Sequence, residues 1–160
     1  MSKFTDEELK TRAYRRVARI LFEQWEESPK GDRGDTRLFD WLVDDRLTCI
    51  GRSAQGAHHR EHVVPRRVIR ELCIKHFAQG GTVEAAAELI RRLLLVARIS
   101  KVEAHHLDVT LKLRTRMPEG WDPDSGDVLA RLDAAGIVPE GGGRWPLSAA
   151  SLDSKDCTKA

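Results

Sequence analysis

The sequence lacks several features that assign a chain to a class at once. Its 160 residues include no asparagine and only three cysteines, Cys49, Cys73 and Cys157. No two cysteines form a CxxC pair, so a zinc ribbon or a zinc knuckle is excluded. No apolar run approaches the length of a membrane span. The opening residues MSKFTDEEL are acidic and polar, unlike a signal peptide, and we therefore expect a cytoplasmic protein without a membrane partner.

Positive charge is concentrated in one part of the chain. The formal net charge is only +2, but residues 60–116 contain 12 lysines and arginines against six acidic residues. A local basic field of this kind favours a polyanionic partner, most simply nucleic acid. A solvated charged face without a partner explains the charge equally well.

The spacing of apolar residues predicts a mainly helical chain. Helices are expected over residues 6–27, 36–47, 66–79, 82–93 and 127–135, and a short helix is expected to begin at Lys101. The run LLLVARI, residues 93–99, is interpreted as the end of a helix followed by a buried strand. The fold class is therefore mainly α with a small β-hairpin, that is α+β. Trp25, Trp41 and Trp121 are expected in the core.

Three segments are expected from the same patterns. Residues 1–50 form an N-terminal helical segment, and residues 51–138 form a second unit in which residues 66–92 are a helical insertion. Residues 139–160 contain the glycine run 141–143 and many small residues, and they are interpreted as a mobile tail. The oligomeric state leaves no signature in the sequence.

The stretch HHREHVVP, residues 58–65, carries the strongest chemical signal. In an extended segment the side chains alternate, so Arg60 and His62 share one face and His59 and Glu61 share the other. A carboxylate beside a histidine can divide two tasks of phosphodiester hydrolysis. The carboxylate can hold a divalent cation, and the histidine, whose ordinary pKa is near neutrality, can take a proton from water.

Together, EHVVP, the strand LLLVARI and the capped helix SKVEAHHLD resemble the ββα-metal finger of HNH (His-Me finger) endonucleases. The resemblance implies that His62 is the general base and that Glu61 is a metal ligand. It also implies a second ligand on the helix, for which His105 is the first choice and His106 and Asp108 are the reserves. The implied cation is Mg²⁺ or Mn²⁺, with Zn²⁺ also suited to imidazole ligands.

By the same resemblance the expected activity is metal-dependent hydrolysis of DNA, with RNA also open as a substrate. Arg60, Arg66 and Arg67 are expected to position the phosphate backbone. The chain differs from the family's usual pattern at three points. Two helices are inserted between the finger strands, the family's central asparagine has no counterpart, and cysteine knuckles are missing.

Two alternatives do not need catalysis. Residues 68–93 can be interpreted as a helix-turn-helix around Gly80 and Gly81, in which Arg91 and Arg92 would meet the DNA backbone. The chain can also be a small helical regulatory protein whose charges only solvate its surface. The first alternative predicts salt-sensitive DNA binding without cleavage, and the second predicts neither.

Overall fold

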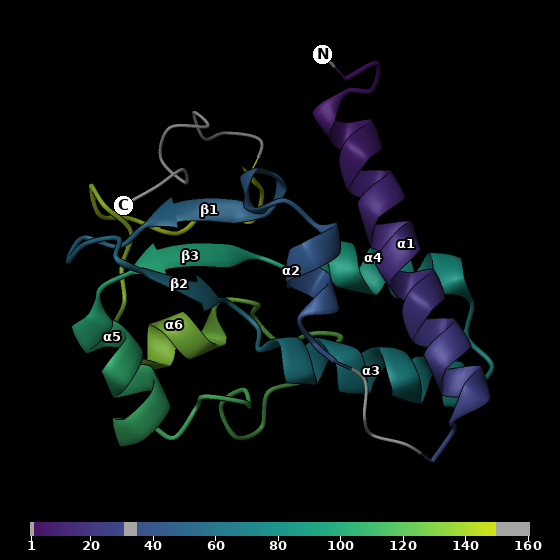
Figure 1. Ribbon diagram of the computed structural model, residues 1–160. Coiled ribbons are helices and arrows are strands. Elements are labelled where there is room, and N and C mark those ends of the chain that lie inside the picture. The colour runs from purple at the N-terminus through teal and green to yellow at the C-terminus, as the bar shows by residue number, and fades with distance from the viewer. Residues whose placement is uncertain (1, 31–34, 150–160) are drawn as a thin grey trace.

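The computed structural model describes residues 2–30 and 35–149. The chain forms a mainly helical α+β fold with one small sheet, as the sequence predicts. Figure 1 shows the three strands on one side of the molecule and α1 (Asp6–Glu27), α3 (Arg66–Ala78) and α4 (Val83–Leu93) on the other. None of the helices in these residues is long and apolar enough to cross a membrane.

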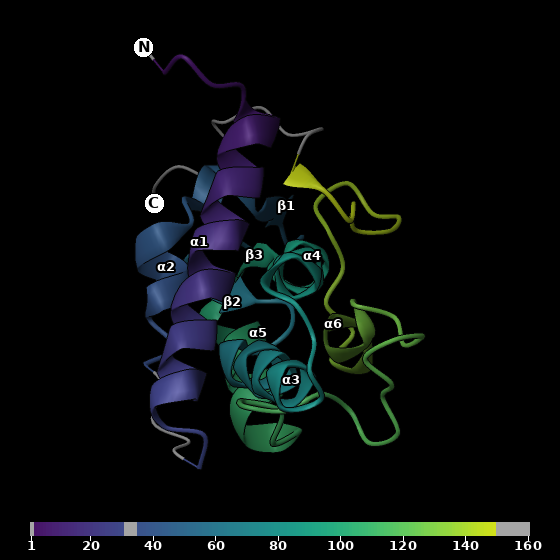
Figure 2. The ribbon, with the colours of Figure 1, turned by 90° about the vertical axis from the view of Figure 1, so that its right-hand side faces the viewer.

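The long helix α1 and the helix pair α3–α4 form the helical side of the core. Helix α1 begins at a capping box, in which Thr5 accepts from the Glu8 amide and the Glu8 side chain accepts from the Thr5 amide. Its buried stripe includes Val17, Ala18 and Leu21, at helical spacing. In Figure 2, α3 and α4 are seen nearly end on beside α1. Gly80, with a φ of +81°, allows the tight turn between them.

The sheet has the strand order β1–β3–β2, with β3 (Val96–Ile99) in the middle. Strand β2 (His59–His62) pairs antiparallel with β3, and Glu61 lies opposite Ala97. The short helix α5 (Lys101–His105) follows β3 directly and continues as the π-helical turn η2 (His106–Thr110). The order strand, inserted helices, strand and helix therefore matches the expected hairpin with its insertion.

A third strand was not expected. Strand β1 (Cys49–Arg52) pairs parallel with β3, whereas the sequence pattern placed a loop after residue 50. Its first three residues are all buried and one of them is a glycine, so the strand lacks the alternation that marks a half-exposed strand. The boundary expected at residue 50 falls within β1, and one apolar cluster includes side chains from both sides of it.

The segment before β1 differs from the long helix expected over residues 36–47. It divides into α2 (Leu38–Leu42) and the 3₁₀ turn η1 (Asp45–Leu47). The prediction that Trp41 is a core residue is wrong, because Trp41 is 68% exposed. Leu38 and Phe39 take the inward face of α2, and at 100° per residue this turns Trp41 away from the core.

The C-terminal segment contacts the end of β1 and then lines a pocket with α1 and α4. Helix α6 (Ala130–Ala134) is shorter than expected, and Pro139 forms an isolated bridge with Ser53. Trp145 is buried and donates from Nε1 to the Ile137 carbonyl at 3.1 Å. The sequence predicted a mobile tail from residue 139, whereas Pro139 and Trp145 have defined contacts in the structure. The rest of that tail lies outside the described residues.

The N-cap of α5 provides a test of how this short helix is held. Ser100 accepts from the Glu103 amide at 3.0 Å, and Glu103 accepts from the Ser100 amide at 2.8 Å. Glu103 also accepts from the Ser53 hydroxyl at 2.6 Å, which connects α5 to the end of β1. Ser100→Ala should lower the free energy of unfolding by about 1 kcal/mol, measured by urea denaturation. Ser100→Thr keeps the hydroxyl and should lose less; equal losses in the two variants would contradict the capping role.

Candidate functional site

The two faces of β2 carry two different polar clusters. On one face, Arg60 and His62 contact each other, with 3.4 Å between Arg60 Nη1 and His62 Nε2. On the other face, His59 Nε2 and Glu61 Oε2 are 3.1 Å apart. The alternation expected from the sequence therefore holds, and each face meets a different part of the chain.

His62 is held by an aspartate from α2. His62 Nε2 lies 3.1 Å from Asp40 Oδ1. A carboxylate oxygen accepts, so Nε2 carries the hydrogen and Nδ1 is left as the nitrogen with a free lone pair. The carboxylate orients the ring and favours the tautomer with hydrogen on Nε2, which is the arrangement of the Asp–His pair in a Ser-His-Asp triad.

Burial keeps His62 neutral. Desolvation lowers the pKa of His62 below its ordinary value, and the charges of Arg60 and Arg66 act in the same direction against the effect of Asp40. Burial alone raises the pKa of the Asp40 carboxyl, but the hydrogen bond with His62 and the neighbouring positive charges outweigh it and lower the pKa to about 2. At neutral pH the pair is therefore a neutral imidazole beside a carboxylate.

The arginines around this pair are tied to acidic side chains. Arg60 donates from Nε to Asp45 at 2.6 Å and from Nη2 to Asp40 at 2.9 Å. Arg66 also pairs with Asp40. Arg60 lies opposite Arg98 in the β2–β3 register, and Asp45 Oδ2 lies 3.4 Å from Arg98 Nη2. Asp45 therefore offsets the repulsion between two arginines on adjacent strands.

On the opposite face, Glu61 is paired with a fully buried arginine from α6. Arg131 Nη1 donates to Glu61 Oε1 at 2.7 Å and to the His62 carbonyl at 2.7 Å. Its Nε donates to the Leu113 carbonyl at 2.7 Å. Nη2 has no hydrogen-bond partner and lies 3.7 Å from Asp108 Oδ1. One guanidinium thus compensates both Glu61 and Asp108.

The expected metal ligands are not assembled around a cation position. Both oxygens of Glu61 already have partners, His59 and Arg131. His105 is exposed on α5, and His106 is half-buried. Within residues 2–30 and 35–149, no group of three or more His, Cys, Asp or Glu side chains is arranged to hold a metal ion. The Mg²⁺, Mn²⁺ or Zn²⁺ site implied by the resemblance therefore does not fit unless Arg131 gives up Glu61.

A pocket of about 330 Å³ joins the two faces of β2. It brings together His62, Glu61 and Asp108 with the three arginines expected to contact phosphate. It does not include His105 or His106. The remaining lining side chains are Thr36, His59, Pro65, Arg114 and Thr115. Arg67 pairs with Glu71 on α3, and Arg114 is exposed. The positive groups at its rim suit an anionic ligand.

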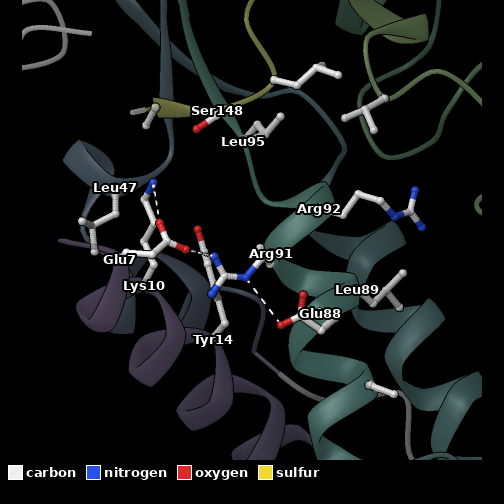
Figure 3. A pocket seen from close by; sticks show the side chains of 14 residues that line it. Glu7, Lys10, Tyr14, Leu47, Glu88, Leu89, Arg91, Arg92, Leu95 and Ser148 are labelled. Atoms are coloured by element: carbon white, nitrogen blue, oxygen red, sulfur yellow. Dashed lines mark hydrogen bonds and ion pairs between the residues drawn. The ribbon is translucent and has the colours of Figure 1, made fainter. Parts of the chain in front are cut away.

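A second pocket lies away from these residues, between α1, α4 and the C-terminal segment (Figure 3). It has a volume of about 620 Å³. Arg91, which the helix-turn-helix alternative placed on the DNA backbone, pairs here with Glu7 and donates to Thr11 at 2.6 Å. Lys10 lies 3.7 Å from Glu7, and burial raises the pKa of Tyr14 to about 12. The ionic contacts in this pocket hold α1 against α4.

Three residues of the site were missed in the sequence. Asp40 and Asp45 lie in a segment expected to be one amphipathic helix, where they read as ordinary surface charges. Arg131 lies in the last expected helix among apolar residues, and a single arginine there carries no motif. A charged residue on the apolar side of a helix was the one signal that could have pointed to Arg131.

Comparison with known proteins identifies no relative of this chain. The chain matches no protein-family model, no curated protein and no solved structure.

Arg131 provides a test of the buried pair. Arg131→Leu should lower the free energy of unfolding by about 3–5 kcal/mol, because it leaves the Glu61 carboxylate buried without a counter-charge. Urea denaturation followed by circular dichroism measures the change. The matched control is Arg144→Leu, which removes an exposed pair with Asp127 and should cost less than about 1 kcal/mol. A similar small loss in both variants would show that Arg131 has no special role.

Proposed function

We propose that the protein hydrolyses phosphodiester bonds of DNA in the pocket beside β2, with His62 as the general base. The observation that carries this proposal is the His62–Asp40 pair at the end of β2. It supplies a neutral imidazole with a fixed tautomer next to a rim of arginines. The antiparallel pair β2–β3 followed directly by α5 supports the resemblance to an HNH finger.

The proposed chemistry uses the residues of this pocket alone. His62 Nδ1 takes a proton from water, and the oxygen of that water forms a bond to phosphorus. The bond to the departing oxygen breaks, and this oxygen takes a proton from solvent. Arg66, Arg67 and Arg114 face the negative charge that develops on the phosphate. The Asp40 carboxylate stabilises the imidazolium that forms, as in other Asp–His pairs.

The test is cleavage of supercoiled plasmid by the parent protein and by His62→Ala, in Mg²⁺, in Mn²⁺ and in EDTA. Loss of the general base should lower the cleavage rate at least about 100-fold. DNA affinity, measured by fluorescence anisotropy at one fixed salt concentration, should not change. His58→Ala is the matched control, because His58 is an exposed histidine of the same segment.

The outcomes separate the parts of the proposal. Equal cleavage by the parent and by His62→Ala would remove His62 from the reaction. Cleavage that EDTA abolishes would show that a cation takes part, and Arg131 would then have to release Glu61. Cleavage that persists in EDTA would show that no cation is needed, and the arginines of the pocket would then stabilise the charge on the phosphate.

The role of Asp40 predicts a shift of the pH–rate profile. The hydrogen bond and the charge of Asp40 favour the protonated form of His62, so Asp40→Ala should lower the pKa of His62 further. The cleavage rate should fall, and the acid limb of the profile should move to lower pH, because His62 then loses its proton at lower pH. Asp133→Ala, an exposed aspartate on α6, should leave the profile unchanged. An acid limb that stays in place in Asp40→Ala would contradict the pairing.

A second candidate function is DNA binding without cleavage. The ion pair between Arg131 and Glu61 favours it, because it engages the carboxylate that the resemblance assigns to a metal. Under this function the parent binds DNA in a salt-sensitive way and leaves plasmid intact in every buffer. The plasmid and anisotropy assays together distinguish the two functions.

A further inference from the structure

An exposed tryptophan lies directly beside the His62 pocket. Trp41 follows Asp40 in α2 and is 68% exposed, although large aromatic side chains are normally buried. The Arg37 guanidinium lies over its ring, 5.4 Å from the centroid. Leu38 and Phe39 already fill the inward face of α2, so Trp41 is not needed for the core.

Trp41 forms part of the wall of a surface hollow of about 700 Å³. The hollow shares Arg60 with the His62 pocket, and it also contains Asp40, the partner of His62. Its other lining residues are Leu42, Asp44 and Asp45. Whatever binds in the His62 pocket therefore has this hollow as its immediate neighbour.

The two hollows differ in the charge that they offer. The His62 pocket has arginines at its rim, which suit phosphate. The Trp41 hollow has three aspartates and one arginine, and its carboxylates repel phosphate. Asp40 and Asp45 already accept from Arg60, but a carboxylate oxygen has a second lone pair that can accept from the amino group of a base. A nucleotide has a base at one end and a phosphate at the other. The indole ring and the carboxylates of the Trp41 hollow suit the base, and the arginines of the His62 pocket suit the phosphate.

We propose that Trp41 is a stacking platform for an unpaired nucleobase, and that the nucleic acid bound at His62 is single-stranded or locally unpaired. This inference rests on the proposed function, since the phosphate next to that base occupies the His62 pocket. A base inside a duplex has no free face, whereas an unpaired base can stack on indole. The substrate class is therefore unpaired DNA.

The experiment compares binding of a mixed-sequence single-stranded DNA and of the same sequence as a duplex. The parent should bind the single strand more tightly. Trp41→Leu should lower the affinity for the single strand roughly 5- to 150-fold, the loss typical of one stacked base, and should change duplex binding little. Trp41→Phe keeps an aromatic face and should retain most of the affinity.

Two controls separate stacking from other effects. Leu147→Ala removes another exposed apolar side chain, 55% exposed and in the pocket between α1 and α4, and should leave both affinities unchanged. Circular dichroism should show that Trp41→Leu keeps its helical content, because the side chain is outside the core. Sedimentation of the parent and of Trp41→Leu tests a contact with a second copy of the chain.

Three outcomes would overturn the inference. Equal single-strand affinities of the parent and Trp41→Leu, with His62→Ala still inactive, would remove the Trp41 site and keep the proposed function. A parent that dimerises through Trp41 while DNA affinities stay equal would make the tryptophan a protein contact. A parent protein that binds neither the single strand nor the duplex would overturn both this inference and the proposed function.

Discussion

The buried guanidinium of Arg131 is the contact on which the site depends. It connects α6 to the backbone of β2, to the Leu113 carbonyl and to Glu61, and it lies near Asp108 of η2. A fully buried charge is costly unless its partners are close, and here a carboxylate and two carbonyls supply them. Because these partners come from separate segments, the pair fixes how the C-terminal part of the chain closes over β2.

The two faces of β2 give Glu61 and His62 different partners. Glu61 forms an ion pair with the buried Arg131, whereas His62 contacts Asp40. The same two neighbouring residues were expected to share one reaction, with Glu61 on a cation and His62 on water. The structure instead gives Glu61 an arginine partner and gives His62 an aspartate. The positive charge of the pocket beside β2 comes from arginine side chains.

Much of the architecture could be predicted from local patterns. The capping boxes at Thr5 and Ser100 and the glycine pair at residues 80–81 marked helix ends, and the structure has them there. Strand β1 could not be predicted, because three successive buried residues out of four leave no alternation to detect. The α2 segment was mistaken for a longer helix, and Trp41 was therefore placed in the core. Local sequence shows that a residue is apolar, but a short helix has room for only a few inward side chains.

The sequence by itself determined the long helices α1, α3 and α4, the β2–β3 pair and the alternation that puts Glu61 and His62 on opposite faces, because these follow from spacing and pleat. Only the tertiary structure decided the partners of those two residues. Asp40 precedes His62 by 22 residues, and Arg131 follows Glu61 by 70. No local pattern encodes such a pairing, because it arises when side chains from α2 and α6 reach opposite faces of one strand.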